Sequence, residues 1–76
     1  MDITASEIQR SAHAGVCELV EQPDAVRWQV YRELATYSGL SAAMIRQFHE
    51  GNRNLTVQSL DKIVLAIEVA KRQRAA

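Results

Sequence analysis

The feature that most constrains the fold is a single glycine, Gly39, set between two stretches with helical spacing of apolar residues. Residues 34–51 read L-A-T-Y-S-G-L-S-A-A-M-I-R-Q-F-H-E-G. Glycine tolerates a positive φ, so Gly39 predicts a tight turn. Ser41 follows as a candidate N-cap, and Ile45 and Phe48 then return to one face at helical spacing. The pattern predicts a helix, a turn and a second helix.

Apolar spacing predicts two further helices, one on each side of this pair. Thr4 and Glu7 have the spacing of a capping box, which predicts a helix over residues 4–22. Pro23 should end that helix and lie in the first turn of the next one. A last helix is expected over residues 56–74. The expected inward residues are Ile8, Ala12, Val16, Leu19 and Val20, then Val26, Val30, Leu34 and Tyr37, then Leu60, Ile63, Val64 and Ile67.

Length and composition limit the class of protein. The 76 residues make one small domain, and an apolar share of 47% is enough for a compact helical core. No apolar run approaches the ~20 residues of a membrane span, and the polar N-terminus does not have the pattern of a signal peptide. The single cysteine, Cys17, cannot form an internal disulfide, which fits a reducing compartment. We therefore expect one all-α, cytoplasmic domain over residues 1–76.

The charges of the chain are balanced in number but uneven in position. Nine basic and nine acidic residues give a formal net charge of zero. Residues 1–50 carry a charge of −3 and residues 51–76 a charge of +3. Such a domain can turn a basic face to phosphates while its other side stays acidic. An ordinary solvated surface explains the same pattern, so charge permits nucleic-acid binding without requiring it.

The stretch around Gly39 resembles the helix-turn-helix domains of the lambda-repressor/Cro class. The resemblance is carried by the small Ala35, by Leu40 after the turn, and by Ile45 and Phe48. It continues after residue 51 through N-R-N-L-T-V-Q-S-L-D-K-I-V-L-A-I-E-V and covers roughly residues 30–69. It implies a compact domain of four to five helices with the motif at about residues 31–51. Because the second helix looks long for the family, either it is extended or residues 25–29 form a separate turn.

The resemblance implies that the helix after the turn enters the DNA major groove. Its outer face presents Ser41, Ala42, Ala43, Arg46 and Gln47 as expected base contacts. Arg46 can bind guanine through two hydrogen bonds, Gln47 can do so with adenine, and the alanines can pack against a thymine methyl. Family members often have polar residues where this chain has Ala42 and Ala43. That difference gives more weight to Arg46, Gln47 and DNA shape.

Phosphate contacts are expected from both sides of this helix. The resemblance implies them for Asn52 and Arg53 in the following loop and for Tyr31 in the helix before the turn. Arg32, on the polar side of that same helix, is a further candidate. Each of these side chains also fits an ordinary solvated surface position. Phosphate contacts position such a domain on the duplex without reading sequence.

The last helix has more apolar residues than one inward face can hold. Leu65 and Val69 lie roughly opposite the core stripe at 100° per residue. They predict a symmetric homodimer through the C-terminal segment, with its recognition helices about 34 Å apart. The alternative is that Val69 closes the core after a helix break, as in the family, and that Leu65 alone is exposed.

Other residues suggest a chemical role, but the sequence around them does not support it. His13 and Cys17 are four residues apart, but zinc requires about four ligands, so no metal or other cofactor is expected. His49 has no nucleophile or orienting partner in the pattern and is expected in a solvated last helical turn. Trp28 and Tyr37 fall on predicted helices and are expected to pack between them. The sequence therefore does not predict an enzyme.

The resemblance implies a sequence-specific double-stranded DNA-binding transcriptional regulator. Free-standing domains of this family are common in phages and prophages as Cro-like repressors, which occupy an operator in a bacterial or phage-infected cell. One alternative is an antitoxin that binds its own promoter and a toxin. A second is a protein-binding module that has kept the fold and lost DNA contact. Salt-sensitive DNA affinity separates the last case from the others.

Overall fold

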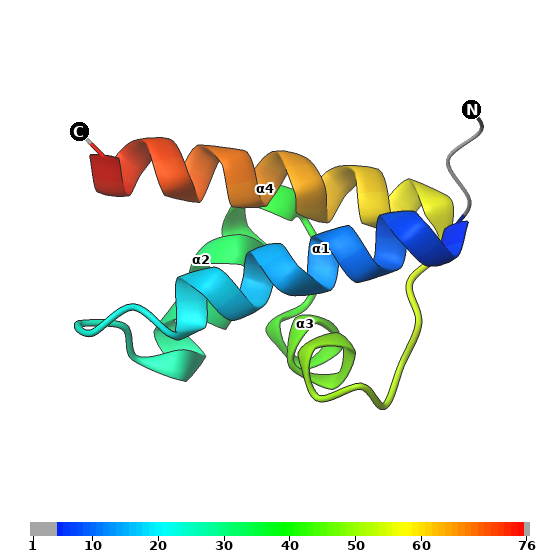
Figure 1. Ribbon diagram of the computed structural model, residues 1–76, viewed down its shortest axis with the longest axis horizontal. Helices are drawn as coiled ribbons and strands as arrows, with labels where there is room; N and C mark the ends of the chain where they lie inside the picture. The colour runs from blue at the N-terminus through cyan, green and yellow to red at the C-terminus, as the bar shows by residue number, and fades with distance from the viewer. Residues whose placement is uncertain (1–4, 76) are drawn as a thin grey trace.

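Four helices make up the described part of the chain, residues 5–75 of the computed structural model (Figure 1). They are α1 (Ala5–Val20), α2 (Arg27–Ser38), α3 (Ala42–His49) and α4 (Val57–Ala75). Helices α1 and α4 lie side by side and run in the same general direction, α2 packs against α4, and α3 packs against α2. The expected compact, all-helical architecture is confirmed for these residues, with principal extents of 35 × 25 × 21 Å.

The turn between α2 and α3 is built from the residues that predicted it. Gly39 ends α2 in the left-handed region, with φ 77°, and its N–H donates to Ala35 O at 2.9 Å. Ser41 then caps α3, because its Oγ accepts the Met44 N–H at 3.1 Å. A residue with a Cβ is strained at such a positive φ. The short connection between the two helices therefore depends on glycine.

Local signals also set the connection between α3 and α4. Gly51, directly after the last turn of α3, has φ 82°. Thr56 precedes α4, and its Oγ1 accepts the Ser59 N–H at 3.2 Å, as an N-cap does. The predicted capping box of Thr4 and Glu7 lies outside the described residues, because Thr4 is not among them.

The connection between α1 and α2 differs from the expectation. Helix α1 ends at Val20, and α2 begins at Arg27 rather than at Pro23. The Ala25 N–H donates to Gln22 O at 3.0 Å, which makes Pro23 the second residue of a four-residue turn. Proline is favoured at that position because its fixed φ suits it. Neither expected arrangement of residues 23–29 holds, because the proline forms a turn before the helix starts.

The hydrophobic core lies between the four helices. Its buried side chains are Ala12, Val16, Leu19, Val30, Tyr31, Leu34, Ile45, Phe48, Leu55, Leu60, Ile63, Ala66, Ile67 and Ala70. Gly15 allows α1 to approach α4 closely, since a Cβ there would stand 3.1 Å from Ile67 Cδ1. None of the described helices is both long enough and apolar enough to cross a membrane.

Three residues expected inside are at the surface instead. Val26 is 44% exposed, Tyr37 is 42% exposed and Trp28 is 53% exposed. The buried stripe of α2 is centred on Leu34. At 100° per residue Tyr37 lies about 60° from Leu34 on the side away from Tyr31, and Trp28 lies about 120° from it. Val26 precedes the helix as its N-cap, with an extended backbone. The expectation was wrong because a helix twelve residues long buries only one narrow stripe against its neighbours.

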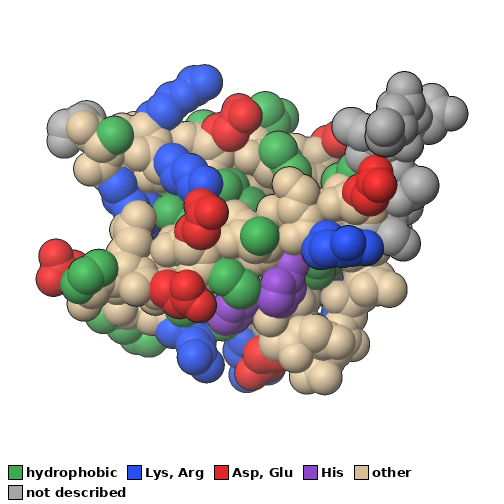
Figure 2. Space-filling view, in the orientation of Figure 1, with side chains coloured by type: hydrophobic (Ala, Val, Ile, Leu, Met, Phe, Trp, Pro, Cys, Tyr) green, Lys and Arg blue, Asp and Glu red, His purple; other side chains and the backbone are tan. Residues whose placement is uncertain are grey.

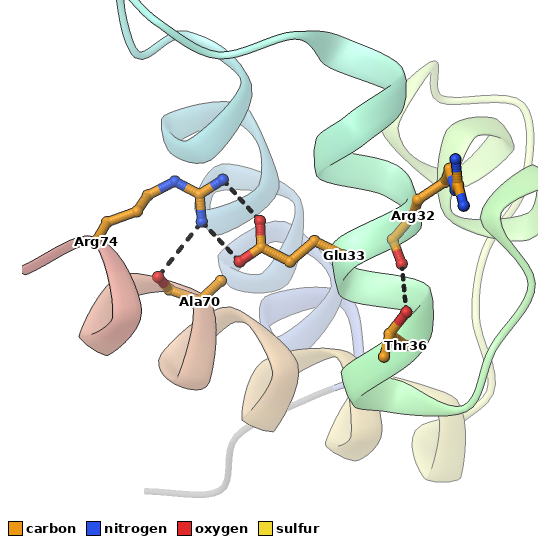
Figure 3. Close-up of polar contacts among 5 residues, drawn as sticks. All are labelled: Arg32, Glu33, Thr36, Ala70 and Arg74. Atoms are coloured by element: carbon orange, nitrogen blue, oxygen red, sulfur yellow. Dashed lines mark hydrogen bonds and ion pairs between the residues drawn. The ribbon is translucent and has the colours of Figure 1, made fainter.

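Acidic and basic side chains alternate on the face shown in Figure 2 and do not separate by sign. Lys71 Nζ lies 2.6 Å from Glu18 Oε2, which joins α4 to α1. Arg74 donates to both carboxylate oxygens of Glu33 at 3.1 and 2.9 Å and to Ala70 O at 3.3 Å (Figure 3). Folding therefore pairs part of the basic C-terminal segment with acids from the first half of the chain. The charge separation along the sequence is reduced in space.

Candidate nucleic-acid interface

Helix α3 turns one face to the core and the other to solvent. Ile45 and Phe48 are buried, which fixes the rotation of the helix about its axis. Ala43 and Arg46 are exposed, and Gln47 is half-buried. These last three residues therefore share the outer face.

The two other predicted base contacts lie at the N-terminal edge of this face. Ser41 is exposed, and its Oγ already accepts the Met44 N–H. Ala42 is partly buried and packs against the core. Ala42 thus has less surface available to a ligand than Ala43 has.

Both polar side chains on the outer face have a partner within the protein. Arg46 Nε lies 3.9 Å from Glu50 Oε1, and the two side chains are 55% and 42% exposed. An exposed pair of this kind contributes only ~0.3–0.5 kcal/mol, so a ligand can readily displace it. Arg53 Nη1 donates to Gln47 Oε1 at 3.3 Å, which leaves the Gln47 amide N–H groups and the other guanidinium donors for another partner.

Three of the four predicted phosphate contacts lie at the surface, namely Arg32, Asn52 and Arg53. The Arg32 guanidinium carbon lies 5.2 Å from the centre of the Trp28 ring, within the range of a cation–π contact. The Arg32 side chain points away from the Glu33–Arg74 pair, as Figure 3 shows. Arg32 and Trp28 thus cover one exposed side of α2 together.

The fourth residue, Tyr31, lies in the core. Its side chain is 3% exposed, and its hydroxyl oxygen stands 2.7 Å from His49 Nδ1. Burial raises the pKa of Tyr31, so the hydroxyl keeps its proton. Because a buried phenol needs an acceptor, we assign the O–H as the donor and the Nε2–H tautomer to His49. A phosphate contact by Tyr31 would require this bond to break.

The histidine side chains form one patch on the face seen in Figure 2. His13 Nε2 lies 2.7 Å from the main-chain oxygen of His49, and since a carbonyl only accepts, His13 donates. His49 is the last residue of α3, so α1 supplies a donor to the carbonyl end of that helix. The two rings stack with centroids 5.6 Å apart, and His13 meets Phe48 edge-on at 5.7 Å. The prediction of a solvated His49 is wrong, because the residue is half-buried and hydrogen-bonded.

The surroundings of His49 favour its neutral form. Burial lowers the pKa of His49, and the charges of His13 and Arg27 lower it further. A neutral ring at pH 7 fits its role as acceptor for Tyr31. The charges of Arg27 and Arg46 lower the pKa of Tyr31, against the larger effect of burial.

Cys17 extends this cluster along α1. Its Sγ lies 3.6 Å from His13 Nδ1. Burial raises the pKa of the Cys17 thiol, and Glu21 raises it further, so the thiol stays protonated. Within residues 5–75, no three His, Cys, Asp or Glu side chains come close enough together to hold a metal ion. The contacts of this cluster are therefore ones that pack the helices together.

The α3–α4 connection (residues 50–56) carries Asn52 and Arg53, and α1 holds its far end. Gln9 Nε2 donates to Leu55 O, and the Leu55 N–H donates to Gln9 Oε1, both at 3.1 Å. The Leu55 side chain is buried in the core at the same point. One amide thus satisfies both backbone groups of a residue 46 positions away.

The predicted dimer residues differ in exposure. Leu65 is 62% exposed, whereas Val69 is half-buried on a helix that continues unbroken past it. Leu65 borders an open groove of about 720 Å³ between α1 and α4. The groove is lined by Glu7, Ile8, Ser11, Asp61, Val64 and Leu65.

No protein-family model, curated protein or solved structure matches this chain. The function of the outer face of α3 is therefore inferred from the geometry of its own residues. Sequence reasoning indicated that face but missed Gln9 and His13, whose contacts lie 46 and 36 positions away. The one available signal was weak, since both are polar residues beside the apolar stripe of α1.

Proposed function

We propose that this chain is a sequence-specific double-stranded DNA-binding transcriptional regulator with a helix-turn-helix domain of the lambda-repressor/Cro class. Helix α3 lies in the major groove, where Arg46 and Gln47 contact base edges. Arg32, Asn52 and Arg53 contact phosphates. The regulator acts as a Cro-like repressor, by occupying an operator and excluding polymerase.

The observation that carries the proposal is the outer face of α3. The helix has eight residues, and an α-helix with its side chains, about 10–12 Å in diameter, fits a major groove about 12 Å wide. It is fixed from behind by Ile45 and Phe48 and capped by Ser41. Its exposed Arg46 is held only by a weak contact that DNA can replace.

The positive charge close to α3 supports the same proposal despite the zero net charge of the chain. Arg46 and Arg53 project from α3 and from the connection after it, and both side chains are exposed. Each phosphate neutralised contributes about −0.9 to the slope of log affinity against log salt. A small set of such contacts gives a modest, measurable salt dependence.

The proposed regulator is a homodimer through α4, centred on the exposed Leu65 with Val69 at the edge. A small single module rarely gains enough affinity alone, and a two-fold dimer doubles the length of DNA read. It also places the two α3 helices about 34 Å apart, one turn of DNA. Sedimentation that shows a monomer at high concentration, with and without DNA, removes the dimer from the proposal.

The first experiment is selection from genomic fragments, including the DNA upstream of the chain's own gene, at two salt concentrations. We expect a palindromic, salt-sensitive site. Arg46→Ala should weaken binding to that site by about 1–3 kcal/mol while changing non-specific binding little. Lys62→Ala, an exposed cation on α4, is the matched control and should leave both unchanged. No enrichment at either salt concentration refutes the proposal. If Arg46→Ala weakens specific and non-specific binding equally, Arg46 is a phosphate contact.

One observation favours a protein partner as the second candidate function. The groove beside Leu65 is apolar at Ile8 and Val64 and has acids at its rim, including Asp61. Such a surface fits a protein helix better than it fits DNA. An antitoxin could bind its toxin there and its promoter through α3. A small toxic enzyme encoded next to this gene supports that reading, and DNA affinity without any such partner opposes it.

A further inference from the structure

Helix α1 anchors the α3–α4 connection at both of its ends. At the start of the connection, His13 Nε2 donates to His49 O at 2.7 Å. At its end, the Gln9 amide pairs with the Leu55 N–H and C=O, both at 3.1 Å. Gln9 and His13 are four residues apart, so they lie one turn apart on the same face of α1. One face of one helix thus fixes both ends of the segment.

Between the two anchors the chain is exposed. The Asn52 N–H still donates to Gln47 O at 2.9 Å, which completes the last turn after α3. From residue 53 to residue 56 there is no regular secondary structure, and Arg53 and Asn54 are exposed. Ordering an exposed backbone segment on binding costs conformational entropy and lowers affinity. The anchors reduce that cost because they restrict the segment before DNA arrives.

We infer that Gln9 and His13 are positioning residues for the phosphate contact of Arg53, an inference that rests on the proposed DNA-binding function. Neither residue touches DNA. By fixing the ends of the connection, they hold the Arg53 guanidinium where it donates to Gln47 Oε1 at 3.3 Å. Arg53 has further N–H donors for a phosphate, so Arg53 contacts the DNA backbone while Gln47 contacts a base.

A double-mutant cycle between Gln9 and Arg53 tests the inference on the selected DNA site. Gln9→Leu removes both amide hydrogen bonds with little change in size. We expect it to weaken binding about five- to tenfold and to lower the salt slope by about 0.9, as Arg53→Ala does. In the Arg53→Ala background, Gln9→Leu should then have little further effect. Glu18→Gln, which removes the charge of an ion pair between α1 and α4 elsewhere, should leave affinity unchanged.

A matched pair of variants tests the other anchor. His13→Gln keeps an N–H donor near the position of Nε2, whereas His13→Ala removes it. We expect His13→Gln to keep the salt slope of the wild type and His13→Ala to lower it. Both are measured at a temperature at which the unfolding curve shows the variant to be folded. Equal behaviour of the two variants, or additive effects of Gln9→Leu and Arg53→Ala, overturns the inference.

Amide hydrogen exchange keeps this result separate from a failure of the proposed function. If the wild type binds no DNA, the proposed function fails, and the inference fails with it. If the wild type binds, exchange at the Leu55 N–H shows whether Gln9→Leu has released the anchor. A released anchor together with unchanged affinity and salt slope shows that Gln9 only satisfies a backbone, which contradicts the positioning role.

Discussion

Replacing Tyr31 with phenylalanine distinguishes the predicted phosphate contact from the bond seen in the core. The ring is buried, and the substitution removes only the oxygen that stands 2.7 Å from His49 Nδ1. If that bond is the main role of the hydroxyl, its loss lowers the free energy of unfolding. If the hydroxyl instead binds phosphate, its loss lowers DNA affinity.

The magnitude follows from the surroundings of the bond. A hydrogen bond of this kind contributes about 0.5–1.5 kcal/mol net, and a fully buried acceptor left without a donor costs more. His49 is only half-buried, so water can reach Nδ1 after the substitution. We therefore expect Tyr31→Phe to lose about 1 kcal/mol, which in a domain of this size lowers Tm by about 4–8 °C.

The assay is thermal and urea unfolding at about pH 8, where His49 is neutral, together with DNA titration of the folded variant. Tyr37→Phe is the control, since Tyr37 lies on the same helix and is 42% exposed. We expect Tyr37→Phe to change stability by less than about 0.5 kcal/mol. An unchanged Tm for Tyr31→Phe together with a several-fold loss of DNA affinity refutes the reasoning from the core.

Two further predictions concern the turn and the histidine patch. Gly39→Ala should lower the free energy of unfolding by about 1–2 kcal/mol through the positive φ alone, because nothing lies within 4 Å of an added Cβ. Gly39→Asn should lower it less, since asparagine tolerates a positive φ better. Equal losses of the two variants in urea unfolding contradict this. Folding lowers the pKa of His49 below the ordinary histidine value of about 6.5, so the unfolded chain binds more protons than the folded one. The neutral His49 therefore contributes stability that is lost as pH falls through about 6.5 toward the folded-state pKa. The decrease in the free energy of unfolding between about pH 8 and about pH 5.5 should be smaller in His49→Asn than in the wild type. An equal decrease in the two proteins assigns the pH dependence to other groups.

The candidate interface was partly predictable because its helix is specified locally. Gly39, Ser41 and the spacing of Ile45 and Phe48 act within one or two turns of chain, so the turn, the cap and the rotation of α3 follow from sequence. Pro23 shows the limit of such reasoning. The same residue suits a helix start and a turn, and the Ala25 N–H to Gln22 O bond decided for the turn.

The sequence by itself determined the helical class, the glycine turn and the exposure of Ala43 and Arg46 on the outer face of α3. Only the tertiary structure decided the partners of polar side chains, because these lie far apart along the chain. Tyr31 meets His49 across 18 positions, His13 reaches His49 O across 36, and Gln9 pairs with Leu55 across 46. Helical periodicity states which way a side chain points relative to its own helix axis. It does not state which other helix lies on that side. The tertiary packing of α1 placed Gln9 and His13 where they bind the two ends of the α3–α4 connection.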